Sequence, residues 1–354
     1  MLSDITILIP SFNRHEYLVR SLYFWESLSL PTIVVDGSQN PLPKRILNTL
    51  SSVTYLHMPN ASVGKRLYEG SKLSRTKYTH TVSDDELLNP EGLVELRNFL
   101  DSNFDFVAAC GHVVAWRSFR YLLFLKPFYS GFSKVKVDQE SPIERVRHHM
   151  SNYQPCSIYS LVRTDVLEIS LQAVSLIDYP EYPEFCELVI EVCNAAQGKL
   201  AVIPVVSWFR NFNVPKLWKP SNLIESWKDL KTVPSFKLHS NQINEFLATR
   251  PDDVPPSQLS DIIQVGLDCY FFGRGASKKQ QQFSYYLWRF PHLLRPFIPN
   301  LLDFILMYLL RRLISRFRNT HQEWYTSSEF MNHFAGSAYD FPVSKWRGHF
   351  SDFR

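Results

Sequence analysis

Short apolar runs alternate with segments of helical periodicity along the first 110 residues of the chain. The runs are rich in β-branched and aromatic residues and are bounded by turn-forming residues, as buried strands are. Regular alternation of strands with helices is typical of a mainly parallel sheet with helices on both faces. We expect strands at 5–9, 32–35, 53–57, 78–82 and 104–110, and helices near 18–25, 46–50, 63–73 and 90–100.

The pattern becomes less regular after these segments. Residues 111–155 are aromatic and basic and show no clear period, whereas residues 157–162 and 200–206 are strand-like. Between the two strand-like runs, residues 184–196 carry apolar side chains at the spacing of an amphipathic helix. We therefore expect the α/β pattern to continue to about residue 210.

A change of character near residue 213 predicts a second region. Mostly helical segments marked by prolines follow, so we expect residues 1–215 to form the α/β domain and residues 216–354 a helical C-terminal region. Within the latter, residues 297–319 are apolar and then rich in arginine. Such a segment is typical of an interfacial helix at a membrane surface, of a buried helix with a basic end, or of a homodimer contact.

The composition is that of a globular protein without the charge of a nucleic-acid-binding one. Of 354 residues, 45% are hydrophobic and 20% charged, and the formal net charge is +4. This excess is too small for a nucleic-acid footprint, so we expect no nucleic-acid partner. The five cysteines are scattered without a CxxC pair, which is typical of reduced thiols. Without a signal-peptide pattern or a membrane-spanning run, we expect a cytoplasmic protein, free or at the inner face of the membrane.

An acidic loop is the strongest candidate for a ligand-binding or metal-binding site. A strand-like run ends in Ser83-Asp84-Asp85-Glu86, and Pro90 then begins a helix. In α/β sheets, ligands bind at the carboxyl ends of strands. Adjacent carboxylates repel each other unless a positive charge compensates, and oxygen ligands suit Mg²⁺ or Mn²⁺. The alternative is a loop of solvated acids that caps the following helix.

Four segments follow one another in the order of a known family: IPSFNR (9–14), IVVDGS (33–38), NASVGKRL (60–67) and the acidic loop. Together they resemble the nucleotide-sugar-binding half of a GT-A glycosyltransferase of the family-2 type. The resemblance is clear over residues 4–112 and weaker over 156–210. It implies a Rossmann-like GT-A fold and transfer of a sugar, with inversion, from a nucleoside diphosphate donor to a hydroxyl of a glycan or lipid-linked acceptor. The typical setting of this family is the biosynthesis of bacterial surface polysaccharide.

The resemblance also implies where the nucleotide lies. Pro10, Ser11 and Phe12 fall where the family holds the base and ribose, and Asp36 where a carboxylate accepts a hydrogen bond from a base N–H. The family usually has two aspartates before Gly-Ser, and here Asp36 stands alone. Guanidinium groups bind phosphate oxygens through two parallel hydrogen bonds. Arg14, Lys65 and Arg66 are expected beside the diphosphate, and Gly64 and Asp84 complete the expected cofactor-binding positions.

The metal ligands follow from the same alignment. Counting back from Pro90 places Ser83 at the first position of the family's DxD and Asp85 at the second. The resemblance therefore implies Mg²⁺ or Mn²⁺ bound first by Asp85, with Asp84 and Glu86 as further ligands. Because serine replaces the first aspartate, the need for a metal stays open.

A general base is expected on the helix predicted at 184–196. Glu187 lies eleven residues before Gly198, where the family has its catalytic carboxylate. Glu184 lies one helical turn earlier on the same face. The resemblance implies that one of them, Glu187 first, takes the proton of the acceptor hydroxyl. The alternative is the solvated face of an amphipathic helix.

Two other functions stay open on sequence grounds. A nucleotidyltransferase also combines an α/β sheet with acidic metal ligands, but its first strand usually leads into a glycine-rich loop, and IPSFNR has no glycine. The other alternative is a non-catalytic protein that binds a nucleotide or carbohydrate on a degenerate GT-A fold. The missing aspartate of the DxD favours this alternative, and the presence of Asp85, Glu187 and Arg66 argues against it.

Overall fold

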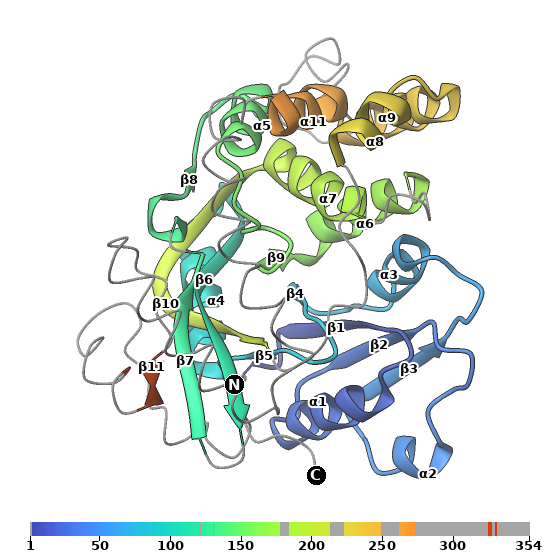
Figure 1. The fold of residues 1–354 in the computed structure, drawn as a ribbon, viewed down its shortest axis with the longest axis vertical. Coiled ribbons are helices and arrows are strands. Elements are labelled where there is room, and N and C mark those ends of the chain that lie inside the picture. Colours follow the sequence, from blue (N-terminus) through green and yellow to red (C-terminus); the bar gives the residue numbers. More distant parts are fainter. Residues whose placement is uncertain are drawn as a thin grey trace, which may run out of the picture.

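The apolar runs of the N-terminal half pair into the parallel part of one sheet (Figure 1). The computed structural model describes residues 2–119, 122–129, 131–177, 184–212, 223–248, 262–272, 325–327 and 330. Strand β1 (Ile5–Ser11) lies between β2 (Thr32–Asp36) and β4 (Tyr78–Thr81), and β3 (Val53–His57) pairs with β2; all three pairings are parallel. Every position of β2 is buried, so the sheet is covered on both faces here.

The second half of the sheet is mixed. Strand β9 (Leu161–Arg163) runs antiparallel between β4 and β6 (Phe106–Phe119), while β10 (Lys199–Asn211) runs parallel to β6. Strand β7 (Leu122–Phe128) pairs with β6 in the antiparallel sense. The remaining short strands of the eleven in the described part are β5 (Leu87–Leu88), β8 (Lys136–Val137) and β11 (Tyr325–Thr326). The predicted α/β class with a parallel central sheet is confirmed.

Helices pack on the sheet and on one another. Helix α3 (Val63–Ser71) packs against β1 and β2, and α4 (Pro90–Ser102) against β6 and β10. Helix α6 (Thr164–Leu176) lies between α3 and α7 (Glu184–Gln197). Helix α1 (His15–Ser27) buries an apolar stripe that includes the fully buried Trp25. The short helix expected near 46–50 is α2 (Lys44–Leu47).

The segment without a clear period contains regular elements. Strand β6 continues to Phe119, and α5 (Pro142–Ser151) follows a single 3-10 turn, η1 (Phe132–Lys134). Positions 107–116 of β6 are all buried. The sequence of this strand therefore lacks the alternation of polar and apolar residues by which a half-exposed strand is recognised. The strand expected at 157–162 is confined to β9.

The described parts of the C-terminal region are mainly helical, as expected. They comprise α8 (Leu223–Leu230), α9 (Pro234–Ala248) and α11 (Ile262–Phe272). Helix α11 packs against α5 and α7, and β11 pairs with β7, so this region is in direct contact with the α/β core. The boundary expected near residue 215 and the basic segment 297–319 lie outside the described residues, and the division into two domains stays a prediction.

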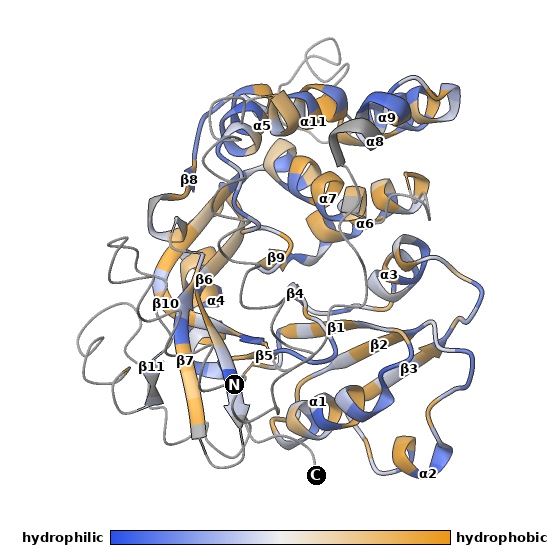
Figure 2. Cartoon of the chain, viewed as in Figure 1, coloured by the Kyte–Doolittle hydropathy of each residue, from blue (hydrophilic) through white to orange (hydrophobic). Residues whose placement is uncertain are grey.

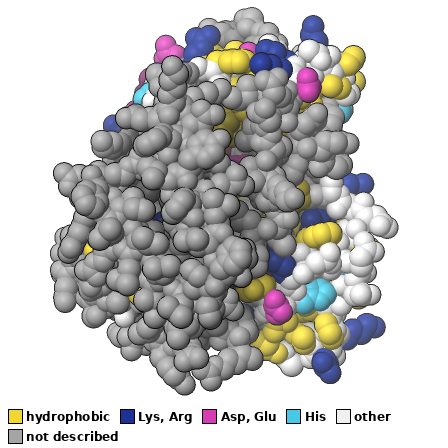
Figure 3. Space-filling model, viewed as in Figure 1, with side chains coloured by type: hydrophobic (Ala, Val, Ile, Leu, Met, Phe, Trp, Pro, Cys, Tyr) yellow, Lys and Arg dark blue, Asp and Glu magenta, His cyan; other side chains and the backbone are white. Residues whose placement is uncertain are grey.

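Hydropathy follows this arrangement (Figure 2): the central strands are mostly apolar, and the helices alternate between apolar and polar positions. On the face seen in Figure 3, lysine and arginine side chains are interspersed with acidic and histidine side chains over the described residues. None of the helices in the described ranges has the length and apolar character needed to cross a bilayer.

Candidate active site

The carboxyl ends of β1, β2 and β3 are in register, with Ser11 opposite Asp36 and Asp36 opposite His57. Asp36 is fully buried. Its Oδ1 accepts a hydrogen bond from the Ser38 backbone N–H (2.8 Å), and its Oδ2 accepts one from the Tyr55 hydroxyl (2.6 Å).

Histidine 15 completes the surroundings of this carboxylate, with His15 Nε2 at 2.9 Å from Asp36 Oδ2. Burial acts to raise the pKa of Asp36, but the hydrogen bonds from Ser38, Tyr55 and His15 outweigh it and lower that pKa below its ordinary value. Asp36 is therefore ionised and held in place by the protein. The contact with a base N–H that the resemblance implies stays a prediction.

The turn after β1 is tied to the turn after β2. Asn13 has a positive φ of 55°, and its backbone N–H donates to Ser38 Oγ (2.7 Å). His57 Nε2 lies 2.7 Å from the Ser38 carbonyl oxygen. Phe12, beside Asn13, is 49% exposed at this rim, and Pro10 is partly buried. The exposed ring is thus available to stack on a flat ligand such as a nucleobase.

Arg66, expected beside a diphosphate, joins two strands in this structure. Its side chain is buried, and NH1 donates to the carbonyl oxygens of Ser11 (2.7 Å) and Val35 (2.8 Å). A Cβ atom at Gly37 would lie 2.6 Å from Arg66 Cζ, so any other residue there would force the guanidinium to shift. The geometry gives Arg66 a structural role, and a contact with diphosphate stays a prediction. The neighbouring Gly64 is buried, and Lys65 is exposed on α3.

The acidic loop folds back onto the start of α1. Ser11 Oγ donates to Asp84 Oδ2 (2.8 Å), and Arg14 NH2 donates to Oδ1 of both Asp84 and Asp85, the latter at 2.9 Å. Arg20 NH2 donates to the backbone carbonyl oxygen of Asp85 (2.7 Å). Burial raises the pKa of Asp84 to about 6, against the opposing effect of Arg14. The two aspartates are thus already compensated by an arginine of the chain.

Glu86 makes its contacts with a different element, β10. Its Oε2 accepts a hydrogen bond from Trp208 Nε1 (2.7 Å), and its Oε1 lies 3.6 Å from Arg210 Nε. Burial raises the pKa of Glu86 to about 8 in spite of Arg210. Arg210 NH1 also donates to the Tyr129 hydroxyl. Arg210 and Trp208 are absent from the sequence-based predictions because the strand expected at 200–206 ends before them.

Glu187 lies on α7 and is partly buried. Its Oε1 accepts a hydrogen bond from the Tyr153 hydroxyl. Burial raises the pKa of Glu187, while Tyr153 and the charge of Arg210 oppose this rise. The interaction with Arg210 brings Glu187 into the same group of charges as Glu86. The other candidate base, Glu184, begins α7, but its side chain lies outside the described part of the chain.

The three predicted metal ligands do not converge on one point. Among the described residues, the group of three metal-binding side chains whose ligand atoms lie within 4.8 Å of one another is His149, Cys156 and Glu191, and it contains none of the three acids of the loop. Asp84 and Asp85 share the guanidinium of Arg14, and Glu86 contacts Trp208. Mg²⁺ and Mn²⁺ can be bound by one or two carboxylates together with water and phosphate oxygens, but the Arg14 guanidinium already lies between the carboxylates of Asp84 and Asp85. With Arg14 in this position the donor set does not fit the metal site expected from the resemblance, and metal dependence stays an untested prediction.

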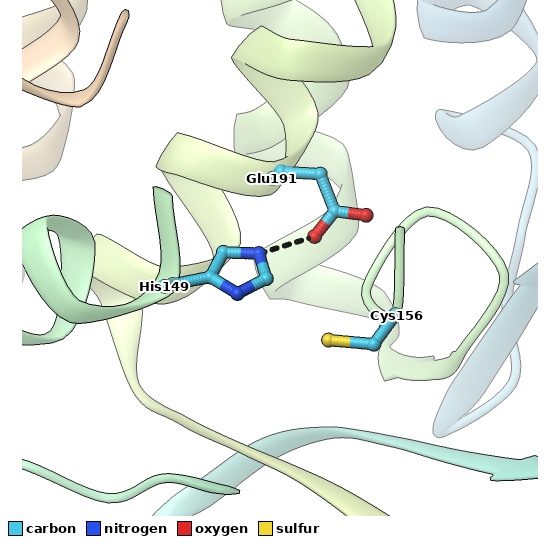
Figure 4. A group of neighbouring side chains, drawn as sticks. All are labelled: His149, Cys156 and Glu191. Carbon is cyan, nitrogen blue, oxygen red and sulfur yellow. Dashed lines mark hydrogen bonds and ion pairs between the residues drawn. The ribbon is translucent and has the colours of Figure 1, made fainter. Parts of the chain in front are cut away.

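His149, Cys156 and Glu191 lie together in the core, where a hydrogen bond joins His149 to Glu191 and the Cys156 thiol lies beside them (Figure 4). Glu191 accepts hydrogen bonds from the Ser157 hydroxyl (2.7 Å) and from the backbone N–H groups of Ser157 and Ile158, and its Oε2 lies 2.7 Å from His149 Nε2. Burial raises the pKa of the Cys156 thiol well above its usual range. Glu191 thus serves to hold the 156–158 turn.

No family model matches this chain. Two curated relatives match part of it: uncharacterized glycosyltransferases of Rickettsia typhi and Rickettsia prowazekii, each 28% identical over 141 residues, which are 38% of this chain and 44% of the relative. The match thus spans less than half the length of these relatives.

Solved structures of S. aureus TarS also overlap with this chain. TarS 1–349 is 13% identical with a TM-score of 0.48, and its complex with UDP-GlcNAc is 14% identical with a TM-score of 0.49. Each comparison covers 81% of this chain and 80% of the TarS chain. The two curated relatives, both named glycosyltransferases, bear out the resemblance: over the matched 141 residues this chain is similar to glycosyltransferases.

Proposed function

We propose that the protein is a glycosyltransferase that moves a sugar from a nucleoside diphosphate sugar to a hydroxyl of a glycan or lipid-linked acceptor, with inversion at the anomeric carbon. One observation carries this proposal: a buried carboxylate network around Asp36, an arginine-paired acidic loop and the carboxylate of Glu187 all belong to one α/β core. Ligands of α/β sheets bind at the carboxyl ends of their strands, where Asp36 and the acidic loop lie. The similarity to proteins named glycosyltransferases supports the same activity.

The donor nucleotide would lie on the rim formed by the turns after β1 and β2. The exposed ring of Phe12 offers a stacking surface, which binds any nucleobase through its π-face. The buried Asp36 holds this rim in one shape through Ser38 and Tyr55. The diphosphate would extend from there toward the acidic loop, where Arg14 supplies positive charge.

The transfer itself needs one proton acceptor. In the proposed step, the acceptor hydroxyl attacks the anomeric carbon, the bond from that carbon to the diphosphate oxygen breaks, and the hydroxyl proton passes to Glu187. The electron pair of the broken bond leaves with the diphosphate. A carboxylate whose pKa is raised by burial is a stronger base than an ordinary glutamate. The hydrogen bond from Tyr153 orients Glu187 for this step.

The metal expected from the resemblance is not part of this mechanism, because Arg14 lies between the carboxylates of Asp84 and Asp85 and Glu86 contacts Trp208. The acceptor and the biosynthesis of surface polysaccharide are inferred from the resemblance alone, and the cytoplasmic location from the scattered cysteines. Contact with a membrane surface or with a second copy through 297–319 is proposed from the apolar and arginine-rich pattern of that segment, which lies outside the described residues.

The proposal is tested by a thermal-shift panel of UDP, GDP, CDP, CMP and dTDP, with and without Mn²⁺, followed by measurement of nucleoside diphosphate release from the matching sugar donors. We expect one diphosphate to raise the melting temperature and its sugar derivative to be turned over when an acceptor is present. Stabilisation without any turnover would favour a non-catalytic binding protein. Release of pyrophosphate from a nucleoside triphosphate and a sugar phosphate would instead favour a nucleotidyltransferase.

A further inference from the structure

Arg14 occupies the position between the two aspartates of the acidic loop. Its NH2 nitrogen donates to Asp84 Oδ1 and to Asp85 Oδ1, and the side chains of Arg14, Asp84 and Asp85 are 16%, 0% and 9% exposed. Burying two neighbouring carboxylates is costly unless a positive charge accompanies them. Here the positive charge comes from the chain itself, 70 positions before Asp84.

The guanidinium of Arg14 keeps hydrogen-bonding capacity for a ligand. It has five N–H donors in a planar fork, and both contacts with the aspartates use NH2. The Nε atom is buried and has no hydrogen-bond partner among the residues that the structure describes. A buried donor without a partner carries a desolvation cost that an anionic oxygen would relieve.

Two further arginines balance the charge of the loop. Arg20 donates to the Asp85 carbonyl oxygen and Arg210 lies beside Glu86, so with Arg14 three guanidinium groups accompany the three carboxylates of the loop. An incoming diphosphate therefore meets no net negative charge at this loop. A divalent cation bound to the same carboxylate oxygens would lie within a few ångströms of the Arg14 guanidinium and be repelled by it.

We propose that Arg14 takes the place of the divalent cation, so that the donor diphosphate binds at the acidic loop without a metal. The inference rests on the proposed function, because it concerns the donor site of that function. It predicts that a nucleoside diphosphate binds equally well in the presence of a chelator and in the presence of Mn²⁺. It also predicts that removal of Arg14 opens a metal site on the two aspartates.

The first test uses the unmodified protein. Titration calorimetry with the diphosphate selected from UDP, GDP, CDP and dTDP is done in EDTA and again in Mn²⁺. We expect dissociation constants that agree within about two-fold. Affinity that falls by about ten-fold or more in EDTA and returns with Mn²⁺ overturns the inference while leaving the proposed function standing. If no diphosphate binds under either condition, the proposed function itself is wrong.

The second test follows Mn²⁺ directly by the electron paramagnetic resonance signal of the free aqua ion. We expect the unmodified protein and the control Arg97→Ala to leave this signal unchanged. Arg14→Ala should reduce it by an amount that corresponds to one bound Mn²⁺ ion per chain. Arg97 forms an ion pair with Asp4, which precedes β1. The control variant therefore also removes one positive charge, but away from the acidic loop. Uptake of Mn²⁺ by the unmodified protein that Asp85→Asn abolishes would contradict the inference, even if Arg14→Ala fails to fold.

Discussion

Tyr153 donates its hydroxyl hydrogen bond to Oε1 of Glu187, the candidate base on α7. Tyr153 is buried, and burial raises the pKa of its own hydroxyl well above the usual range, so it remains a donor at every pH at which the protein would act. A donor directed at a carboxylate stabilises the ionised form. Two of the predictions below follow from this pair.

Replacing Tyr153 by Phe should move the acid limb of the activity profile to higher pH. Burial already raises the pKa of Glu187, and the Tyr153 hydrogen bond lowers it, so loss of the hydroxyl leaves a still higher pKa. Since the base must be ionised to accept a proton, kcat/KM should fall at acidic pH and recover at alkaline pH. The measurement is the pH profile of donor turnover, with the exposed Tyr23→Phe as control. An acid limb at the same pH in both variants would show that Glu187 is not the base.

Replacing Glu187 by Gln should abolish transfer but leave the donor site intact. General base catalysis contributes about 10²–10⁴-fold to a rate, and we expect a loss of that size in kcat. The dissociation constant of the nucleoside diphosphate should stay unchanged, because the residues expected to hold the nucleotide lie on other elements. Glu184→Gln is the matched control from the same helix. Normal turnover by Glu187→Gln, with loss in Glu184→Gln, would assign the base to Glu184.

The sequence predicts the N-terminal half of the sheet well because each motif there directly follows an apolar run. Ser11 and Asp36 are the last residues of two parallel strands. The order of the elements along the chain is therefore enough to predict that both lie at the same edge of the sheet. Strand β10 is different. Its pairing with β6 shifts register at three places, and these irregularities break the simple alternation on which strand prediction depends. Arg210 therefore escapes recognition although it contacts Glu86.

Contacts between distant residues could not be predicted from the sequence. Arg14 is recognised as a cation of the site, but only the folded chain shows that its partners are Asp84 and Asp85. The bridging role of Arg66 depends on the close approach of α3 to the turn at Gly37, which no periodicity encodes. Tyr153 lies in a segment without a clear pattern, and its contact with Glu187 arises from the packing of α5 on α7.

Gly37→Ala should destabilise the protein and weaken nucleotide binding. The added Cβ would lie 2.6 Å from Arg66 Cζ, and that guanidinium bridges the carboxyl ends of β1 and β2. Overpacking at such a site costs about 1–3 kcal/mol. Urea unfolding measures the stability, and the diphosphate titration measures the site. Gln39→Ala, an exposed position in the same turn, should be neutral, and equal stability of both variants would contradict the bridging role of Arg66.

Glu191→Ala should be among the most damaging substitutions in the α/β core. It removes the acceptor for the backbone N–H groups of Ser157 and Ile158 and the hydrogen-bond partner of His149. Glu191 itself is fully buried, so water cannot replace these contacts. Removing one partner of a buried charged network costs about 3–5 kcal/mol, and Glu191→Gln, which keeps one acceptor oxygen, should cost less. Urea unfolding of both variants measures the difference. Because Glu191 acts through hydrogen bonds and not through a metal, EDTA should leave the melting temperature of the unmodified protein unchanged. A fall in that temperature, restored by Zn²⁺, would instead make His149, Cys156 and Glu191 a metal site.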